Sequence, residues 1–484
     1  MTDMTRTITR RIAPLLAALL LAACSSIPEL KAPALDMPSA FKESSEPLQA
    51  ADGTRWKVAQ PAEGQARGEW WLAFNDANLT ALIKEATDAN ANLAVAAARV
   101  KQARALAGLS AADRSPQVGA GVGAQRSRNS GVSRGLADDA SVAPGNVYQA
   151  RLTASYELDL FGRVAANVSA ANADAAASEA TYKSVLLALQ ADVAQTYFKL
   201  RETDAELATL ARTVDLRTQS VKVNQSRYDN GDIGEFDLAR ARTELSTVRA
   251  EAIGLQRQRV QYEHALAVLL GKPAAMFSAG VNPLVESALL PAIPAGLPSA
   301  LLERRPDITA AQRAMIAANA RIGVAKTAMY PSLSLTGGLG TESGSGGNLF
   351  NWSARSWVLG ALLSMPIIDG GRNKANIARS EAVLEESVAS YRQNVLVAFA
   401  EVEDNLAGLR ILAGQTEQID AAVVSARRSA DLAQKLYNAG RSSYLDLLDS
   451  QRNLAAVERN AVQLRGDRAV TTVALIRSLG GGWQ

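Results

Sequence analysis

The 484-residue sequence predicts a mainly helical protein that also carries two β-hairpins of membrane-spanning length. Apolar side chains recur at helical spacing along most of the chain, which is typical of long amphipathic helices. The period changes to 2 in two places, at about 116–161 and about 331–368, which indicates strands. The two halves of the chain also resemble each other. These patterns together predict one module of strands and long helices used twice.

The internal two-fold repeat is clearest in two short motifs, Arg227–Leu238 and Leu436–Leu447. Equivalent positions lie 209 residues apart from Phe161 onward and 215 residues apart near the start of each half, so six extra residues lie in the first half between Pro116 and Gly162. These pairs illustrate the two offsets: Tyr228 with Tyr437, Gly231 with Gly440, Asp237 with Asp446, Leu93 with Ile308 and Pro116 with Pro331. A glycine between two helical patterns suits a tight turn. We therefore expect two helical hairpins with tips at about 229–235 and 438–443.

Each predicted β-hairpin is followed by a very long helical pattern, 163–228 and 372–437. At about 1.5 Å per residue such a helix extends ~100 Å, which exceeds an ordinary globular domain. After each tip the chain returns with apolar positions in a seven-residue repeat, which indicates a coiled coil. Arg259 and Arg468 interrupt this repeat at equivalent positions, and we expect each to extend to solvent at a helix crossing.

Each predicted strand has ~9–12 residues, the length that spans a bilayer when tilted. Four strands are too few to enclose a lumen, and open sheet edges are not tolerated in lipid, so a membrane role requires several chains. Three chains would supply twelve strands, an even number large enough for an aqueous lumen. The predicted fold is thus a trimeric 12-stranded β-barrel, four strands per chain, continuous with a long α-helical coiled-coil barrel. The alternative is a soluble β-hairpin at the end of a coiled coil.

The N-terminus has the form of a lipoprotein signal peptide, residues 1–23, because basic residues and an apolar run precede Cys24. Lipidation of Cys24, including a palmitate chain, would anchor the mature chain, and Ser25 after it favours the outer membrane. The alternative is an ordinary secretory signal with an accidental cysteine. Residues 24–69 predict an extended tether, and residues 70–271 and 301–484 the two repeats. Six prolines at 273–306 predict a connector over about 272–300.

Composition excludes several classes of function. The chain has one histidine, His264, and one cysteine, so we expect no metal site, no cofactor and no catalytic centre. The formal net charge of +3 is small and spread along helical patterns, which gives no reason to expect nucleic acid as a partner. The functions that composition does not exclude are a channel, an adaptor or another structural role.

Several motifs carry a resemblance to a known family, as follows: Ser155–Arg163, Leu301–Ile308, Tyr330–Leu335, Met365–Arg372, Tyr444–Arg452 and the terminal Leu479–Trp483. With Cys24 and the duplication, they make the chain similar to the outer-membrane factor (TolC-like) family, and most similar to its lipidated branch, the NodT/OprM-like outer-membrane proteins of RND efflux pumps. The resemblance implies a homotrimer in the bacterial outer membrane that extends into the periplasm. Its implied partners are a periplasmic adaptor (membrane fusion) protein and an inner-membrane RND transporter.

The resemblance also implies where the functional residues lie, all of them at the helix tips. It places a periplasmic gate at Leu445, Asp446 and Asp449. It implies a latch of Tyr437, Asp237 and a basic residue; the family's basic position falls on Ser442 here, with Arg441 beside it. Adaptor docking is implied at the tips themselves: Gly231, Asp232, Gly234, Gly440, Ser442 and Ser443. The alternative for the acidic residues is an ordinary solvated helix face.

The leading functional hypothesis is a passive exit duct of a tripartite efflux system, gated at the periplasmic tips and conducting drugs or other toxic solutes. A periplasmic coiled-coil adaptor lipoprotein is one alternative, although two membrane-length hairpins argue against it. An exit duct for a type I secretion system is another. An enzyme has little support, because His264 lies in a helical pattern without a partnered nucleophile.

Overall fold

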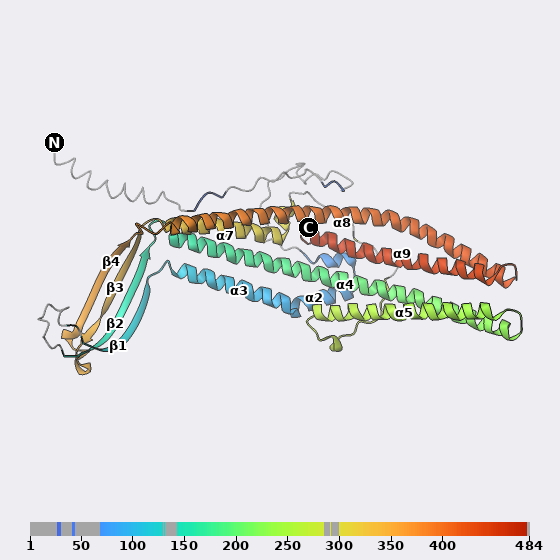
Figure 1. The fold of residues 1–484 in the computed structure, drawn as a ribbon, viewed down its shortest axis with the longest axis horizontal. Helices are drawn as coiled ribbons and strands as arrows, with labels where there is room; N and C mark the ends of the chain where they lie inside the picture. The colour runs from blue at the N-terminus through green and yellow to red at the C-terminus, as the bar shows by residue number, and fades with distance from the viewer. Residues whose placement is uncertain are drawn as a thin grey trace. The chain divides into compact units, whose positions relative to one another are not determined.

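The structure, a computed structural model, describes residues 27–30, 41–43, 68–128, 130, 143–284, 291 and 300–481. They divide into two compact units (Figure 1). The first unit draws on Met1–Ala34, Val100–Ser178 and Ala311–Tyr391; the second draws on Leu35–Arg99, Glu179–Ala310 and Arg392–Gln484. Most described residues are helical and four strands are present, which confirms the predicted mainly α class.

All four strands belong to the first unit and form one antiparallel sheet in the order β1-β2-β3-β4. The strands are β1 (Gln117–Ser127), β2 (Gly145–Leu158), β3 (Ser332–Ser343) and β4 (Arg355–Ser364). Each strand pairs with the next in sequence, with Gly119 opposite Thr153, Thr153 opposite Gly338, and Gly338 opposite Val358. Among the described residues β1 and β4 each have one neighbouring strand, so both outer edges of the sheet are unpaired in this part of the chain.

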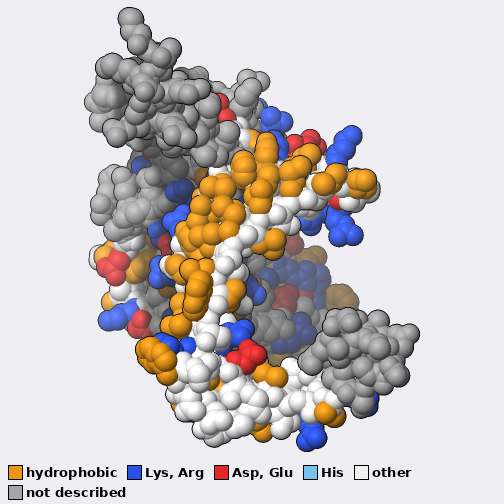
Figure 2. Space-filling model, turned by 90° about the vertical axis from the view of Figure 1, so that its left-hand side faces the viewer, with side chains coloured by type: hydrophobic (Ala, Val, Ile, Leu, Met, Phe, Trp, Pro, Cys, Tyr) orange, Lys and Arg blue, Asp and Glu red, His pale blue; other side chains and the backbone are white. Residues whose placement is uncertain are grey.

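The sheet has one apolar and one polar face, because directly opposed residues share a face and side chains alternate along each strand. The exposed large side chains of the apolar face are Val118, Val122, Leu152, Leu335, Leu339, Trp357, Leu359 and Leu363. The opposite face carries Gln149, Arg151, Thr153, Thr336 and Glu342 with glycines between them, and two apolar side chains of β4, Val358 and Leu362. Hydrophobic side chains form a band where the strands face the viewer in Figure 2.

Helical segments of the first unit are tied together where they meet the strands. Helix α4 (Arg163–Asp229) begins after β2, and α7 (Pro306–Thr327) ends before β3. Phe161 and Tyr330 stack at 5.0 Å between the two connections. The guanidinium of Arg321 on α7 pairs with the carboxylate of Asp174 on α4. These contacts hold the helices at the ends of the strands from which they continue.

In the second unit, two long helical hairpins lie together (Figure 1). Helix α4 turns into α5 (Glu235–Leu269), and α8 (Arg372–Asn438) turns into α9 (Tyr444–Ser478). Both α4 and α8 have 67 residues, and both α5 and α9 have 35. Helices α3 (Ala91–Ala112) and α4 each contribute residues to both units.

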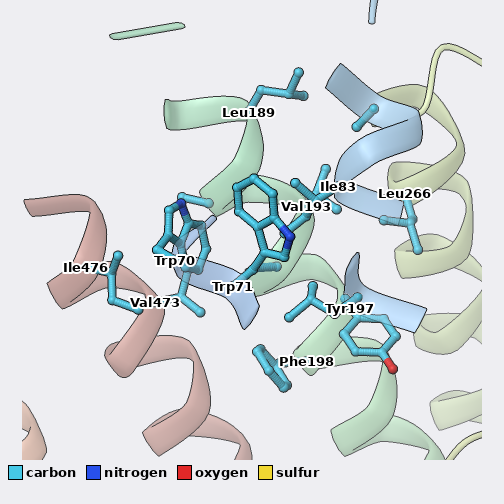
Figure 3. Close-up of a cluster of buried hydrophobic side chains, with 14 of the residues drawn as sticks. Trp70, Trp71, Ile83, Leu189, Val193, Tyr197, Phe198, Leu266, Val473 and Ile476 are labelled. Carbon is cyan, nitrogen blue, oxygen red and sulfur yellow. The ribbon is translucent and has the colours of Figure 1, made fainter. Parts of the chain in front are cut away.

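The main apolar core of the second unit packs the first elements of the first repeat against the long helices (Figure 3). A 3-10 turn (Trp70–Phe74) supplies Trp70 and Trp71, and α2 (Ala77–Ala89) supplies Ile83. They pack on side chains of α4, α5 and α9, namely Leu189, Val193, Phe198, Leu266, Val473 and Ile476. Helix α2 is held at its start because Asp76 accepts the N–H groups of Asn78 and Leu79. Trp70 and Trp71 are thus part of a buried core.

The expectation for Arg259 was wrong. Its Nε donates to Asp204 at 2.6 Å and its Nη1 to Glu263 at 2.9 Å, while Nη2 donates to the Ala279 carbonyl at 2.8 Å. Asp204 is buried and also accepts the Asn282 N–H. Arg259 therefore joins α4, α5 and the chain that follows α5 instead of extending to solvent. A guanidinium suits this position because its five donors satisfy several acceptors at once.

Parts of the tether are described where they contact the helices. Phe41 is only 3% exposed and packs with Leu301, Val402 and Leu475. The N–H groups of Lys42 and Glu43 donate to the Glu403 carboxylate at 2.7 and 3.0 Å. The predicted lipidation residue Cys24 and most of the proline-rich connector lie outside the described residues. None of the described helices combines the length and apolar character of a membrane-crossing helix.

Candidate gate and docking site at the helix tips

Both helical hairpins turn through the same backbone geometry. Gly231 and Gly440 have φ angles of 79° and 69°, the left-handed region that glycine tolerates best. The N–H of Asp232 donates to the Arg227 carbonyl at 2.8 Å, and the N–H of Arg441 donates to the Leu436 carbonyl at 2.9 Å. These bonds close the last helical turn, as in a Schellman motif. The repeated glycines of the sequence therefore end α4 and α8.

The second tip begins α9 with a capping box that the first tip lacks. The N–H of Asp446 donates to the Ser443 hydroxyl oxygen at 3.2 Å, and the N–H of Ser443 donates to the Asp446 carboxylate at 3.0 Å. The bonds from the hydroxyl and N–H of Ser443 lower the pKa of Asp446, so this carboxylate stays ionised at neutral pH. At the first tip Gly234 occupies the equivalent position without a side-chain cap.

The three predicted gate residues lie together at the start of α9 and are exposed in the single chain. Leu445 and Asp446 fall in the first turn, and Asp449 lies one turn further. The charge of Asp449 acts on Arg452, whose guanidinium pairs with Glu244 on α5. The arrangement presents two carboxylates and one apolar side chain on a single exposed stretch of helix.

The predicted latch residue Tyr437 has partners other than those expected. Its hydroxyl accepts a hydrogen bond from Nη1 of Arg227 at 2.8 Å and lies 3.4 Å from Oδ1 of Asn224. The Arg227 guanidinium also lies 4.9 Å from the centre of the Tyr437 ring. Among the described residues, neither Asp237 nor Arg441 is hydrogen-bonded to Tyr437. Within one chain the tyrosine thus fastens α8 to α4 through Arg227.

An apolar contact below the tips joins the two hairpins. Tyr444 lies 6.0 Å from Tyr437, ring centre to ring centre, and packs with Ala241, Leu448 and Val221. Burial raises the pKa of Tyr444. Its hydroxyl and that of Ser442 are buried without a partner in the part of the chain that is described. A buried hydroxyl without a partner costs about 1–3 kcal/mol, so both positions lower the stability of this contact.

Polar bonds continue this contact along α5 and α9. Arg452 pairs with Glu244, and seven residues along both helices Arg459 pairs with Glu251 at 3.0 Å. The bond to Arg452 lowers the pKa of Glu244. The fully buried Arg217 of α4 donates from Nη1 to Oε1 of Gln451 at 2.5 Å. The two hairpins are thus held in one axial register.

Two tip residues were missed by sequence analysis. Arg227 forms the hydrogen bond to Tyr437, and its only local signal is a cation directly before the repeated tyrosine. Phe236 occupies the position on the first tip that corresponds to Leu445 on the second, and it is 75% exposed. The alignment of the two tip motifs in the sequence already pairs Phe236 with Leu445. Within the described residues, no cluster of three or more His, Cys, Asp or Glu side chains could hold a metal ion.

Comparison with known proteins gives one consistent result. The family model for outer membrane efflux proteins matches residues 82–272 and 297–481. The cation efflux system protein CusC of Escherichia coli O6:H1 is 33% identical over 98% of this chain and 99% of its own length. The solvent efflux pump outer membrane protein SrpC of Pseudomonas putida is 33% identical over 97% and 98%. The crystal structure of the Campylobacter jejuni CmeC outer membrane channel superposes with a TM-score of 0.85 at 25% identity, covering 95% of this chain and 96% of that one.

Proposed function

Because the chain belongs to the outer membrane efflux protein family, we propose that three copies form a gated exit duct, fed by an inner-membrane pump through a periplasmic adaptor. The protein is an outer-membrane efflux channel, and the family is one of ducts rather than enzymes. The trimer, the twelve-stranded barrel, the lipid anchor and the residue roles described below form our proposal.

The proposal of a trimer rests on one observation. The sheet has an apolar face, a polar face and two unpaired edges. An apolar face suits lipid and a polar face suits an aqueous lumen. Unpaired N–H and C=O groups along β1 and β4 would be costly in hydrocarbon, because no water is present to satisfy them. Joining β4 of one chain to β1 of the next removes every edge.

The internal repeat supports the same assembly. Helices α4 and α8 are equal in length, as are α5 and α9. The β1–β2 register becomes the β3–β4 register when β1 is shifted by 215 residues and β2 by 209: Gly119 opposite Thr153 becomes Ser334 opposite Leu362. Six such modules in three chains would surround one axis with nearly equal spacing.

We assign the gate to the second tip. In a trimer, Asp446 and Asp449 would bring six carboxylates around the axis, which attracts cations and resists anions. Like charges at short range repel, so the closed state needs other contacts to hold it. The bond of Tyr437 with Arg227 and the pairing of Arg452 with Glu244 supply such contacts within each chain. Asp237 and Arg441 would then act between chains.

Docking of the adaptor is proposed at the two turns, through Gly231, Asp232 and Gly234 on one and Gly440, Ser442 and Ser443 on the other. The exposure of Gly231, Asp232, Gly234, Gly440 and Ser443 supports this, since small exposed residues leave the backbone of both turns open to a partner. The partner would be a periplasmic adaptor joined to an inner-membrane RND transporter. Relatives named for cation and for solvent efflux share this chain's full length, so we propose that the pump, not the duct, selects the cargo.

The proposed lipid anchor at Cys24 is supported by the segment that follows it. The Asn319 side-chain amide of α7 donates to the Pro28 carbonyl at 2.7 Å, and Ile27 lies against Gly323, where an added Cβ would meet it at 3.0 Å. Three residues span at most ~10 Å, so an acyl chain on Cys24 would lie near this part of α7. That position is about nine residues before β3, close to one end of the proposed barrel.

The test is single-channel conductance of the purified protein in planar bilayers. Wild-type protein should give small cation-selective steps, and Asp449→Asn should reduce the selectivity without disturbing the capping box. Asp431→Asn, which removes an exposed carboxylate of α8 outside the proposed gate and latch, is the matched control and should leave selectivity nearly unchanged. Absence of conductance from folded trimers of every variant would overturn the duct. Unchanged selectivity in Asp449→Asn would overturn the gate alone.

A further inference from the structure

Arg217 on α4 is buried between the two helical hairpins with little to neutralise its charge. Its side chain is only 2% exposed, and Nη1 donates to Oε1 of Gln451 on α9 at 2.5 Å. Its Nε has no hydrogen-bond partner among the described residues. We call this contact the tip seam, made by Arg217, Ala241 and Glu244 of the first hairpin and Tyr444, Leu448, Gln451 and Arg452 of the second. A neutral amide does not compensate a buried cation.

The carboxylate in the tip seam is already engaged. Glu244 on α5 accepts hydrogen bonds from Nε and Nη2 of Arg452. Burial lowers the pKa of Arg217 more than the nearby Glu244 raises it. Arg217 therefore adds an uncompensated cation beside an ion pair that is complete without it, and burying such a charge is strongly unfavourable.

The internal repeat indicates that the packing does not require a cation at this position. The equivalent residue in the second hairpin, 209 positions later, is Ala426 on α8, which is 6% exposed. The position is thus buried in both hairpins, but it carries a charge in the first and a methyl group in the second. The charge of Arg217 therefore calls for another explanation than the packing that the hairpins share.

We infer that Arg217 sets the balance between the closed and open gate by weakening the closed tip seam, because its charge is buried while the hairpins are together and regains water when they part. This inference rests on the proposed gated duct and adds a residue to its gate. Two contacts hold the hairpins together, the Tyr437–Arg227 bond and the Glu244–Arg452 pair. Arg217 opposes them, so the seam closes without becoming too stable for a docked partner to open.

A chain of side-chain amides connects Arg217 to the second tip. Nε2 of Gln451 donates to Oε1 of Gln434 on α8 at 3.2 Å, and Nε2 of Gln434 donates to Oδ1 of Asn438 at 2.9 Å. Asn438 is the last residue of α8, and Gln451 stands two residues after Asp449 of the proposed gate. Separation of Arg217 from Gln451 would therefore free the turn that carries the gate on both sides.

The test is the reactivity of a cysteine placed in the tip seam. Ala241 on α5 is 1% exposed and packs with Tyr444 and Leu448, so Ala241→Cys is shielded from a water-soluble thiol reagent while the seam is closed. The labelling rate of this cysteine in the folded, full-length protein then measures how often the seam opens. The same protein without Ala241→Cys gives the background from Cys24.

Arg217→Met, which keeps the length of the side chain and removes its charge, should slow the labelling about tenfold, because the closed seam then buries no unpaired cation. Arg212→Met is the matched control, since it removes an exposed cation from the same helix, and it should leave the rate unchanged. Gln451→Leu takes away the acceptor of Arg217 and should speed the labelling. Added to Arg217→Met, Gln451→Leu should have a much smaller effect.

The frequency of channel openings in planar bilayers should change in the same direction as the labelling rate. Unchanged or faster labelling of Arg217→Met would overturn the inference, since the guanidinium would then not weaken the seam. Slower labelling with an unchanged opening frequency would overturn the link between the seam and the gate. Absence of conductance from every variant, wild type included, would overturn the duct and the gating role together, whereas the labelling rates would still decide whether Arg217 weakens the seam.

Discussion

The substitution Gly466→Ala tests how tightly α9 packs on α4. Gly466 lies in the middle of α9, where alanine would ordinarily be better by about 1 kcal/mol. An added Cβ, however, would overlap Oε2 and Cδ of Glu202 on α4. The Glu202 carboxylate is held there because Lys199 donates to it at 3.0 Å and to Asp467 at 2.8 Å. We therefore expect alanine at 466 to displace Glu202 and break its bond to Lys199.

The expected change in the free energy of unfolding is the sum of two losses and one gain. Overpacking a buried seam costs about 1–3 kcal/mol. The lost hydrogen bond costs about 1 kcal/mol more, and the gain in helix propensity offsets about 1 kcal/mol. Gly466→Ala should therefore destabilise each chain by about 1–3 kcal/mol. Thermal unfolding followed by circular dichroism, at one scan rate and one protein concentration, should show a lower Tm.

Gly254→Ala is the matched control, because Gly254 lies within α5 with nothing near its added Cβ. It should raise the Tm slightly. Glu202→Ala combined with Gly466→Ala should recover most of the loss, since the methyl group then has room. The reasoning is refuted if Gly466→Ala raises the Tm as Gly254→Ala does, or if the double variant is no more stable than Gly466→Ala alone.

Two further predictions concern buried charge, and a third concerns the latch. Burial raises the pKa of Glu202 from 4.5 to about 7. Protonation of Glu202 therefore stabilises the folded chain fully below pH 4.5, and this stabilisation is lost as the pH rises through 7. Glu202→Gln should make the Tm nearly independent of pH across that range and should be more stable than wild type at pH 8. Arg259→Met should cost about 3–5 kcal/mol in thermal unfolding because it strands a buried carboxylate, whereas Arg257→Met on the exposed side should change little. Arg227→Gln should raise open probability in bilayers more than Arg441→Gln; the reverse order would assign the latch to Arg441.

Much of the fold could be predicted from local sequence patterns. The long helices α4 and α8 begin at Arg163 and Arg372, where the helical periodicity begins, and the strands lie where the period changes to 2. The hairpin turns were visible as repeated glycines because the left-handed backbone is costly for other residues. The capping box was equally local, since Ser443 and Asp446 stand three residues apart.

Pairing across long sequence separations was not predictable from periodicity. Arg259 looked like an interruption of a heptad, and nothing nearby in sequence pointed to Asp204, 55 residues earlier. The bond between Arg227 and Tyr437 spans 210 residues and depends on how two hairpins pack. Phe41 stands in a proline-rich stretch without a period, yet it is buried. Such contacts follow from tertiary packing, which a single sequence encodes only indirectly.

The two open edges of the sheet have a genetic consequence. In the proposed trimer, every chain pairs its β1 with one neighbour and its β4 with the other. A single chain with a defective edge strand therefore prevents the barrel from closing. A cell making equal amounts of normal and edge-defective chains would then assemble only about one-eighth of its rings from normal chains alone. Alleles that disrupt either edge strand should accordingly be dominant, whereas alleles that prevent the chain from being made should be recessive.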